Sequence, residues 1–292
     1  MAPPLDGDYL HLRPPPHLLD RAREELGETD ETRADALSTL TRTLTEQAAA
    51  GHTAAAAVLG GLAADAPFLL TFLRWAKFSL PVATARLASF AAFVGAHEWA
   101  AAPDEATLRR VYEHGALSFT PHTTIDGRVV LTLLAGPLLG LIEDVGLDVI
   151  NRAAFWAFCA LLRDPEVAIS GVVFVEDLRG CMDTRMVAVV RSKENAFGWR
   201  MMQQVLPLRL QGVYFLYQPP GVGVLWAVLA RLFAPKLRRR VRMLGRNRAA
   251  LEALMPPASL PVSMDGEAVE ELTYSSELAL AGLRATPWMG RV

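Results

Sequence analysis

The chain has 292 residues, a formal net charge of −2 at pH 7 and a mean hydropathy of +0.23. Its length allows one large domain or two modest ones, and its nearly balanced charge argues against a protein that binds nucleic acid through overall electrostatics. The two cysteines, Cys159 and Cys181, have neither a CxxC nor a metal-ligand spacing, which fits a reducing, cytosolic compartment. Hydrophobic residues make up 52% of the chain, and this high share predicts an internal apolar cavity.

We expect neither a membrane-spanning segment nor a signal peptide. Residues 1–16 are rich in proline and lack the apolar stretch of a signal peptide. The apolar runs 129–142 and 153–162 are shorter than the ~20 residues that cross a bilayer. These features predict a soluble, cytoplasmic protein that begins with an irregular segment.

Residues 17–115 predict an all-helical N-terminal domain. Apolar residues recur at helical spacing in the segments 18–26 and 32–50. Asp65 and Ser79 stand where N-cap residues begin the next two helices.

From residue 116 to about 270, predicted strands alternate with helices. Leu117–Ile125 and Arg128–Leu134 flank Asp126-Gly127, a strong signal for a β-hairpin turn. The elements expected after this hairpin are a helix at 147–163, a strand at 167–178, a helix to about 205 and a strand at 212–218. Strands separated by such helices form a largely parallel sheet. The predicted fold class is α/β, with a mainly parallel sheet flanked by helices, after the helical domain and before a tail at 271–292.

The segment 206–245 contains a strand, an uncharged apolar helix and a basic run in direct succession. The predicted helix, from Val222 to Phe233, has no polar face, so something must cover it. Lys236, Arg239 and Arg240 follow at spacings that place them on one side of a short helix. Two interpretations are open: a core helix followed by a solvated basic surface, or a lid beside a site for anions.

This segment resembles the C-terminal half of CRAL-TRIO (Sec14-like) lipid-binding domains, in the branch that includes retinaldehyde-binding and tocopherol transfer proteins. The shared pattern is Pro-Leu-Arg at 207–209, Gln218-Pro219, Lys236-Leu237 and Gly245. The stretch FLLTFLRWAKF at 68–78 is similar to the family's FLxRFLRARKF signature, and residues 260–266 stand where the family has a closing strand. The resemblance covers about residues 17–272 and implies a CRAL-TRIO lipid-binding domain at 116–270, after a helical CRAL-TRIO N-terminal domain.

The resemblance implies three sets of site residues. The phosphoinositide-binding set is Arg74, Arg209, Lys236 and Arg240. The gate helix is represented by Val222, Leu225, Trp226, Leu229 and Phe233. The residues expected to line the ligand pocket are Ala154, Phe155, Phe158, Val172, Phe174, Glu176, Met201, Met202, Val213 and Phe215.

Two of these assignments have plain structural alternatives. Period-two alternation places Val172, Phe174 and Glu176 on one face of a strand, and the resemblance implies that this face lines the pocket. Glu176 at the strand's end fits a solvated carboxylate equally well. Arg74 fits either a membrane contact or an exposed charge on a helix.

The chain lacks GxSxG, GxxxxGK[ST] and HExxH motifs, so we expect no catalysis, metal or cofactor. The resemblance implies a cytosolic carrier that encloses one hydrophobic molecule, of retinoid or tocopherol size, and exchanges it at phosphoinositide-containing membranes. The alternative is a trafficking adaptor that binds phosphoinositides without transferring ligand. We expect a monomer that associates with membranes transiently. We expect no nucleic-acid partner, since no aromatic residue interrupts the basic run.

Overall fold

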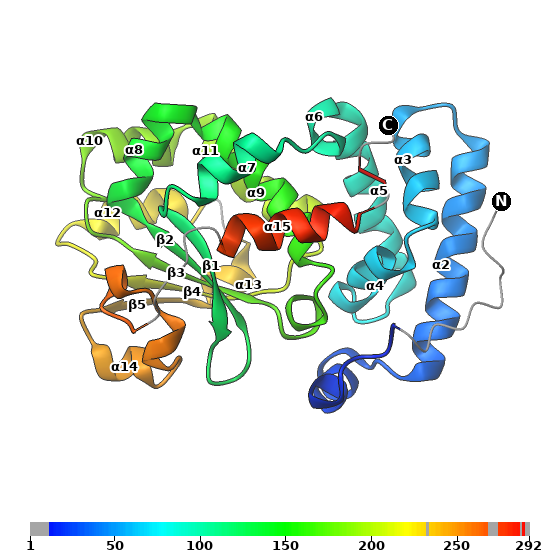
Figure 1. Cartoon of the computed structure of the whole chain (residues 1–292), viewed down its shortest axis with the longest axis horizontal. Coiled ribbons are helices and arrows are strands. Elements are labelled where there is room, and N and C mark those ends of the chain that lie inside the picture. The colour runs from blue at the N-terminus through cyan, green and yellow to red at the C-terminus, as the bar shows by residue number, and fades with distance from the viewer. Residues whose placement is uncertain (1–11, 232–233, 268–273, 287, 290–292) are drawn as a thin grey trace.

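The computed structural model describes the chain except for residues 1–11, 232–233, 268–273, 287 and 290–292. A helical region is followed by an α/β region, and the two lie side by side (Figure 1). The helices of the first region are α1 (Leu19–Arg21), α2 (Asp30–Ala50), α3 (Ala54–Ala63), α4 (Ala66–Trp75), α5 (Leu80–Ala96) and α6 (Glu98–Ala101), and the next helix, α7 (Glu105–Tyr112), packs on the α/β region.

Local capping and aromatic packing hold the helical region together. The Asp65 side chain accepts a hydrogen bond from the Phe68 backbone N–H at 3.1 Å, which confirms the predicted start of α4. The rings of Phe68 and Phe72 from α4 pack at 5.5–5.6 Å against Phe90 from α5. Such buried aromatic clusters supply much of a core's apolar area, and this one joins the two helices.

The α/β region is built on one five-stranded sheet in the order β1-β2-β3-β4-β5. The strands are β1 (Leu117–Thr123), β2 (Val129–Leu134), β3 (Val172–Asp177), β4 (Leu210–Leu216) and β5 (Val241–Gly245). Strands β1 and β2 pair antiparallel, and the other three pairs are parallel. The predicted hairpin turn is confirmed, with Gly127 at φ 69°. The α/β class and the mainly parallel sheet are therefore confirmed.

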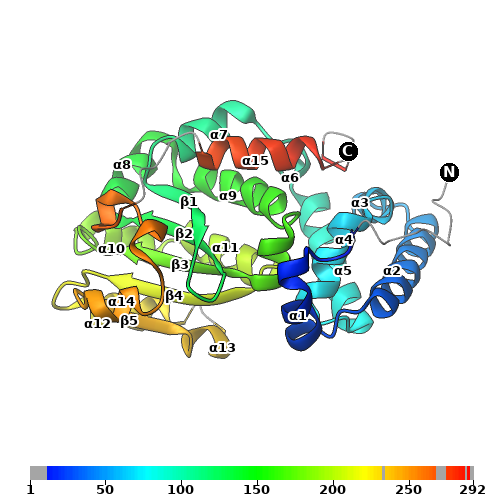
Figure 2. The same cartoon turned by 60° about the horizontal axis from the view of Figure 1, so that its bottom comes forward.

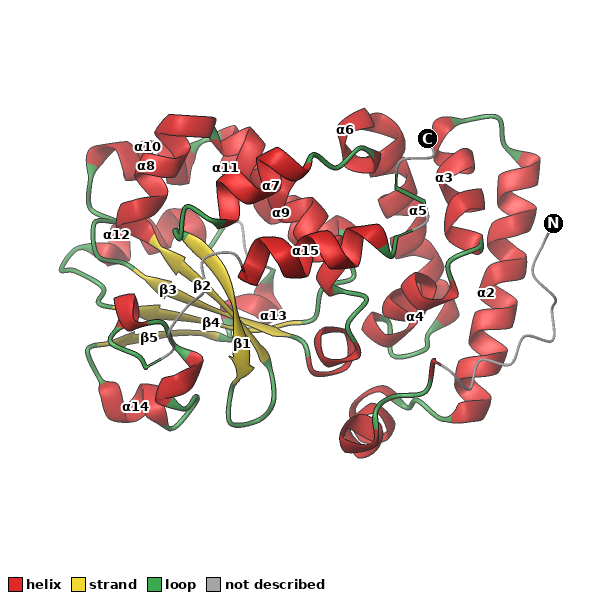
Figure 3. Cartoon of the chain, viewed as in Figure 1, coloured by secondary structure: helices red, strands yellow, loops and turns green. Residues whose placement is uncertain are grey.

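Helices cover both faces of the sheet (Figure 3). They are α8 (Ala135–Val145), α9 (Leu147–Leu161), α10 (Thr184–Arg191), α11 (Lys193–Arg200), α12 (Val222–Leu229), α13 (Pro235–Arg238) and α14 (Arg248–Glu252). Val172 and Phe174 of β3 belong to the large core under α9, whereas Val173 and Val175 belong to a smaller core with Leu251 of α14. The period-two alternation predicted for this strand is confirmed.

The last described helix, α15 (Tyr274–Arg284), connects the two regions. It lies along α9 (Figure 1), where Gly282 is so close to Ala160 that an added Cβ would lie 2.5 Å from the alanine Cβ. Beyond this helix, Trp288 inserts into the helical region, with its ring 5.5 Å from Phe68 and 5.4 Å from Phe90. The described part of the segment expected to be a tail thus contributes to the large core, which spans both regions.

Three expected elements differ from the structure. The strand expected at 167–178 begins only at Val172, because Glu166–Ser170 forms a π-helical turn. The expected basic helix ends at Arg238, and the residues after it, Val241–Gly245, form the edge strand β5. A strand suits these residues because its side chains alternate between the two faces, and Val241 can then pack against the large core. Residues expected to form a closing strand adopt a 3-10 turn at Val262–Met264.

Among the described residues, no single helix combines the length and apolarity needed to cross a membrane. Helices α3 and α4 meet that test only when taken together, and they are bent by 100° where they join.

Candidate functional site

An apolar pocket lies over one end of the sheet, and a single row of side chains forms its floor. Leu133 of β2 is paired with Glu176 of β3, Glu176 with Phe215 of β4, and Phe215 with Met243 of β5. All four residues line the pocket. Because directly paired residues point to the same face of a sheet, this row places one carboxyl group among three apolar side chains.

Helices form the walls of the pocket. The wall residues are Leu138 from α8, Leu147 from α9, Met186, Val189 and Val190 from α10, Asn195 and Trp199 from α11, and Val222 and Trp226 from α12. The cavity measures about 120 Å³. Ligand pockets for small molecules usually enclose ~300–1,000 Å³, so an occupant of that size requires the walls to move apart.

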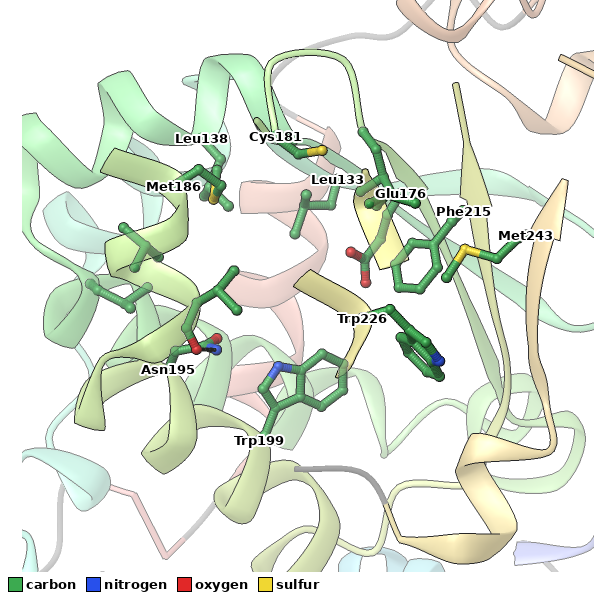
Figure 4. Close-up of a pocket in the computed structure, with 16 residues that line it drawn as sticks. Leu133, Leu138, Glu176, Cys181, Met186, Asn195, Trp199, Phe215, Trp226 and Met243 are labelled. Carbon is green, nitrogen blue, oxygen red and sulfur yellow. Dashed lines mark hydrogen bonds between the residues drawn. The ribbon is translucent and has the colours of Figure 1, made fainter. Parts of the chain in front are cut away.

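Among the described residues that line this pocket, Glu176 is the only acidic one. Figure 4 shows its carboxyl group directed into the pocket, with Asn195 and Trp199 on the opposite wall. Burial raises the pKa of Glu176 from 4.5 to about 7, because a charged carboxylate is poorly solvated in an apolar pocket. The group is therefore largely protonated below pH 7, when it can donate a hydrogen bond.

Helix α12 closes one side of the pocket and has an apolar outer surface. Val222 and Trp226 line the pocket, and the Trp226 ring packs 5.9 Å from Phe215. On the outer surface, Val224 is 73% exposed, and no residue of the helix is charged. The side chains of Leu225 and Leu229, and all of Phe233, lie outside the described residues. An exposed apolar helix over a pocket is the kind of surface that contacts another apolar phase.

Two of the ten expected pocket residues, Glu176 and Phe215, line the pocket. The others belong to neighbouring parts of the structure: Phe155 packs on Phe93 and Phe90 of the helical region, and Phe158 stacks on Phe174 at 6.2 Å. Met201, Val172 and Val213 are buried in the same core, which Ala154 and Met202 also contact. Alternation identifies which residues share a face of the strand, but it does not show where along that face the packed core ends and the pocket begins.

A group of cations, here called the basic cluster, lies near the other end of β4. Its members are Lys77, Arg128, Arg209, Lys236, Arg239 and Arg240. The pKa of Lys236 is lowered mainly by the charge of Arg240, then by burial and by the charges of Lys77, Arg209 and Arg239. Close cations that repel one another in this way form a favourable site for an anion.

The structure brings three of the four expected phosphoinositide-binding residues together, namely Arg209, Lys236 and Arg240. The fourth, Arg74, is 4% exposed, and its Nε and Nη2 atoms donate to the Glu28 carboxylate at 2.9 Å. The Glu28 carboxylate is itself 0% exposed, so this buried pair is not available to a lipid headgroup. Lys77, three residues later, is exposed and contributes to the basic cluster instead, because the chain turns there with φ 52°.

Comparison with known proteins identifies the family to which this helix-flanked sheet and its apolar pocket belong. The CRAL/TRIO domain model matches residues 113–266, and the chain belongs to this family, whose domains bind lipophilic ligands. The branch within the family stays a prediction.

Relatives share part of the chain at modest identity. Human (Homo sapiens) Clavesin-2 is 26% identical over 117 residues, which are 40% of this chain and 36% of Clavesin-2. Rat (Rattus norvegicus) Clavesin-1 is 24% identical over 213 residues, which are 71% of this chain and 59% of Clavesin-1. The chain thus spans less than two thirds of the length of either relative. The crystal structure of Sfh5 shares the fold, with a TM-score of 0.55 at 14% identity over 88% of this chain and 98% of Sfh5.

Proposed function

We propose that this protein is a cytosolic carrier that encloses one hydrophobic molecule under α12 and exchanges it at phosphoinositide-containing membranes. The observation that carries the proposal is the apolar pocket closed by an uncharged helix with an exposed apolar surface. Burial alone can supply the affinity, since each buried CH₂ group contributes about 0.8 kcal/mol. The side chains that line the pocket offer binding contacts, and the proposal requires no catalytic step.

The ligand that suits this pocket best is an isoprenoid of retinoid or tocopherol size rather than a phospholipid with two acyl chains. Aromatic side chains, those of Trp199, Phe215 and Trp226, take up much of the wall, and the cavity between them is narrow at about 120 Å³. A flat or single-chain molecule enters such a space with less displacement of the walls. The single carboxyl group, on Glu176, matches a ligand with one hydroxyl or carbonyl group.

We expect Val224→Asp to slow the transfer of retinol or tocopherol between vesicles about tenfold while leaving pre-bound ligand in place. Val224 is 73% exposed, so the variant should fold, but it loses about 1.5 kcal/mol of apolar contact with the membrane. Val262→Asp is the matched control, since Val262 is 63% exposed on a different element. The measurement is the transfer rate from loaded donor vesicles to empty acceptors, with phosphatidylcholine as a competitor.

The same assay separates the carrier from the alternative adaptor. If the wild-type protein binds vesicles without moving any ligand between them, it is an adaptor. Equal transfer by both aspartate variants would mean that the exposed surface of α12 does not contact the membrane. Displacement of every isoprenoid by phosphatidylcholine would contradict the proposed ligand class.

We expect Lys236→Ala combined with Arg240→Ala to weaken binding to phosphoinositide vesicles about 30-fold at low salt. Each cation near an anionic membrane surface contributes about 1 kcal/mol, and salt should reduce the wild-type affinity by screening. Lys193→Ala combined with Arg200→Ala is a control with the same change in net charge, because both side chains are exposed on α11. Vesicle sedimentation at several salt concentrations measures the effect, and equal binding by the two double variants would exclude the basic cluster as the headgroup site.

A further inference from the structure

A short N-terminal segment, Pro16–Leu26, packs against the α/β region next to the basic cluster. Its apolar residues, Leu18, Ala22 and Leu26, form a small core with Ile169, which lies just before β3. Figure 2 shows the helix of this segment, α1, beside the right-hand end of the sheet. The segment is therefore anchored independently of any charged contact.

This anchored segment places one carboxylate on the basic cluster. The Glu25 Oε2 atom accepts a hydrogen bond from Arg209 Nη2 at 2.8 Å, and its Oε1 atom lies 3.7 Å from Arg128 Nη2 and 3.6 Å from Arg21 Nε. The Glu25 side chain is 34% exposed, whereas that of Arg209 is 9% exposed. The carboxylate thus lies on the solvent side of the guanidinium and covers it.

Two carboxylates, those of Glu25 and Asp126, do not balance the charge of the guanidinium groups at this point. Three guanidinium groups, those of Arg128, Arg209 and Arg240, lie close enough that Arg128 lowers the pKa of both others, although burial is the larger cause in each. The nearby Asp126 carboxylate pairs with Arg128 at 2.7 Å, and among the described residues Arg209 has no carboxylate partner other than Glu25. A phosphate monoester carries up to about two negative charges and three acceptor oxygens, so it matches these arginines better than Glu25 does.

We propose that Glu25 is a built-in competitor for phosphate at Arg128, Arg209 and Arg240. A phosphate group, on a lipid headgroup or free in solution, must displace the Glu25 carboxylate to reach Arg209. The affinity of the basic cluster for phosphate is therefore lower than the arginines alone would give. The N-terminal segment, which holds Glu25 in place, determines how much lower. This inference rests on the proposed function only for the lipid source of the phosphate.

The test compares Glu25→Gln with wild type and with Glu24→Gln. Glutamine keeps the shape of the side chain and removes its charge, and the apolar anchor keeps the segment in place. Glu24 is exposed on the same turn, so Glu24→Gln changes the net charge equally without touching the arginines. Binding is measured at low salt to two probes: phosphatidylcholine vesicles that carry a phosphatidylinositol bisphosphate, and inorganic phosphate.

We expect Glu25→Gln to bind at least one probe about fivefold or more tightly than both wild type and Glu24→Gln, which is the lower end of coupling between competing ligands. Tighter binding to vesicles alone identifies a lipid headgroup as the source of the phosphate, and tighter binding to inorganic phosphate identifies the free anion. Equal gains by both variants, or no gain by Glu25→Gln with either probe, would overturn the proposal. Binding of inorganic phosphate by Glu25→Gln tests this inference without a membrane, whereas vesicle binding by the alanine variants of Lys236 and Arg240 tests the proposed membrane contact.

Discussion

Trp288→Ala is expected to lower the free energy of unfolding by about 3–5 kcal/mol, the usual loss when a buried tryptophan is truncated. The Trp288 side chain is 2% exposed, and its ring lies within 5.5 Å of Phe68 and Phe90. Its backbone follows α15, which packs on α9 of the α/β region. Truncation therefore leaves a cavity where the segment that follows α15 packs into the helical region.

Trp288→Phe is the matched control and should lose far less stability. Phenylalanine keeps most of the aromatic contact, and it removes an indole N–H that is buried without a hydrogen-bond partner among the described residues. Urea unfolding followed by circular dichroism measures both variants. If Trp288→Ala unfolds within about 1 kcal/mol of wild type, the ring does not hold the two regions together.

Much of the architecture could be predicted because its signals are local. The Asp126-Gly127 turn, the Asp65 cap and the alternation of Val172 to Asp177 depend only on neighbouring residues. Strand β5 was missed because its five residues follow a run of arginines that also fits a helix, and only pairing with β4 decides between the two. Met243 was consequently missed as a pocket residue, although its alternation with Arg242 was a usable signal.

The candidate site was predicted less completely, since it depends on contacts between distant segments. The cations of the basic cluster come from elements separated by more than 100 residues, and sequence spacing could not show that Arg74 pairs with Glu28 while Lys77 faces the cluster. Much of the pocket wall comes from α10 and α11, whose mixed composition indicates only amphipathic helices. The resemblance supplied the type of site, and the structure is needed to show which side chains form it.

Glu176→Gln is expected to stabilise the protein at pH 8 by up to about 3 kcal/mol while leaving it unchanged near pH 4. The pKa of Glu176 is about 7 in the folded protein against an ordinary 4.5, so the unfolded chain loses this proton first as the pH rises. Between these two values the folded state binds more protons, and wild-type stability falls with rising pH through that window. Each pKa unit corresponds to about 1.36 kcal/mol of stability. Glutamine stays neutral at every pH, so the variant does not lose this stability as the pH rises.

The same proton should make ligand retention depend on pH. Below pH 7 the neutral Glu176 carboxyl donates a hydrogen bond to a ligand hydroxyl or carbonyl group, and above pH 7 a buried charge opposes an apolar occupant. We therefore expect the affinity of the wild-type protein for retinol to decrease as the pH rises from 6 to 8, and that of Glu176→Gln to stay constant. Retinol fluorescence and urea unfolding at each pH measure the two effects, with Glu98→Gln as control because Glu98 is exposed at the start of α6. A pH profile for Glu176→Gln that parallels the wild-type profile in both measurements would show that this carboxyl group does not titrate inside the pocket.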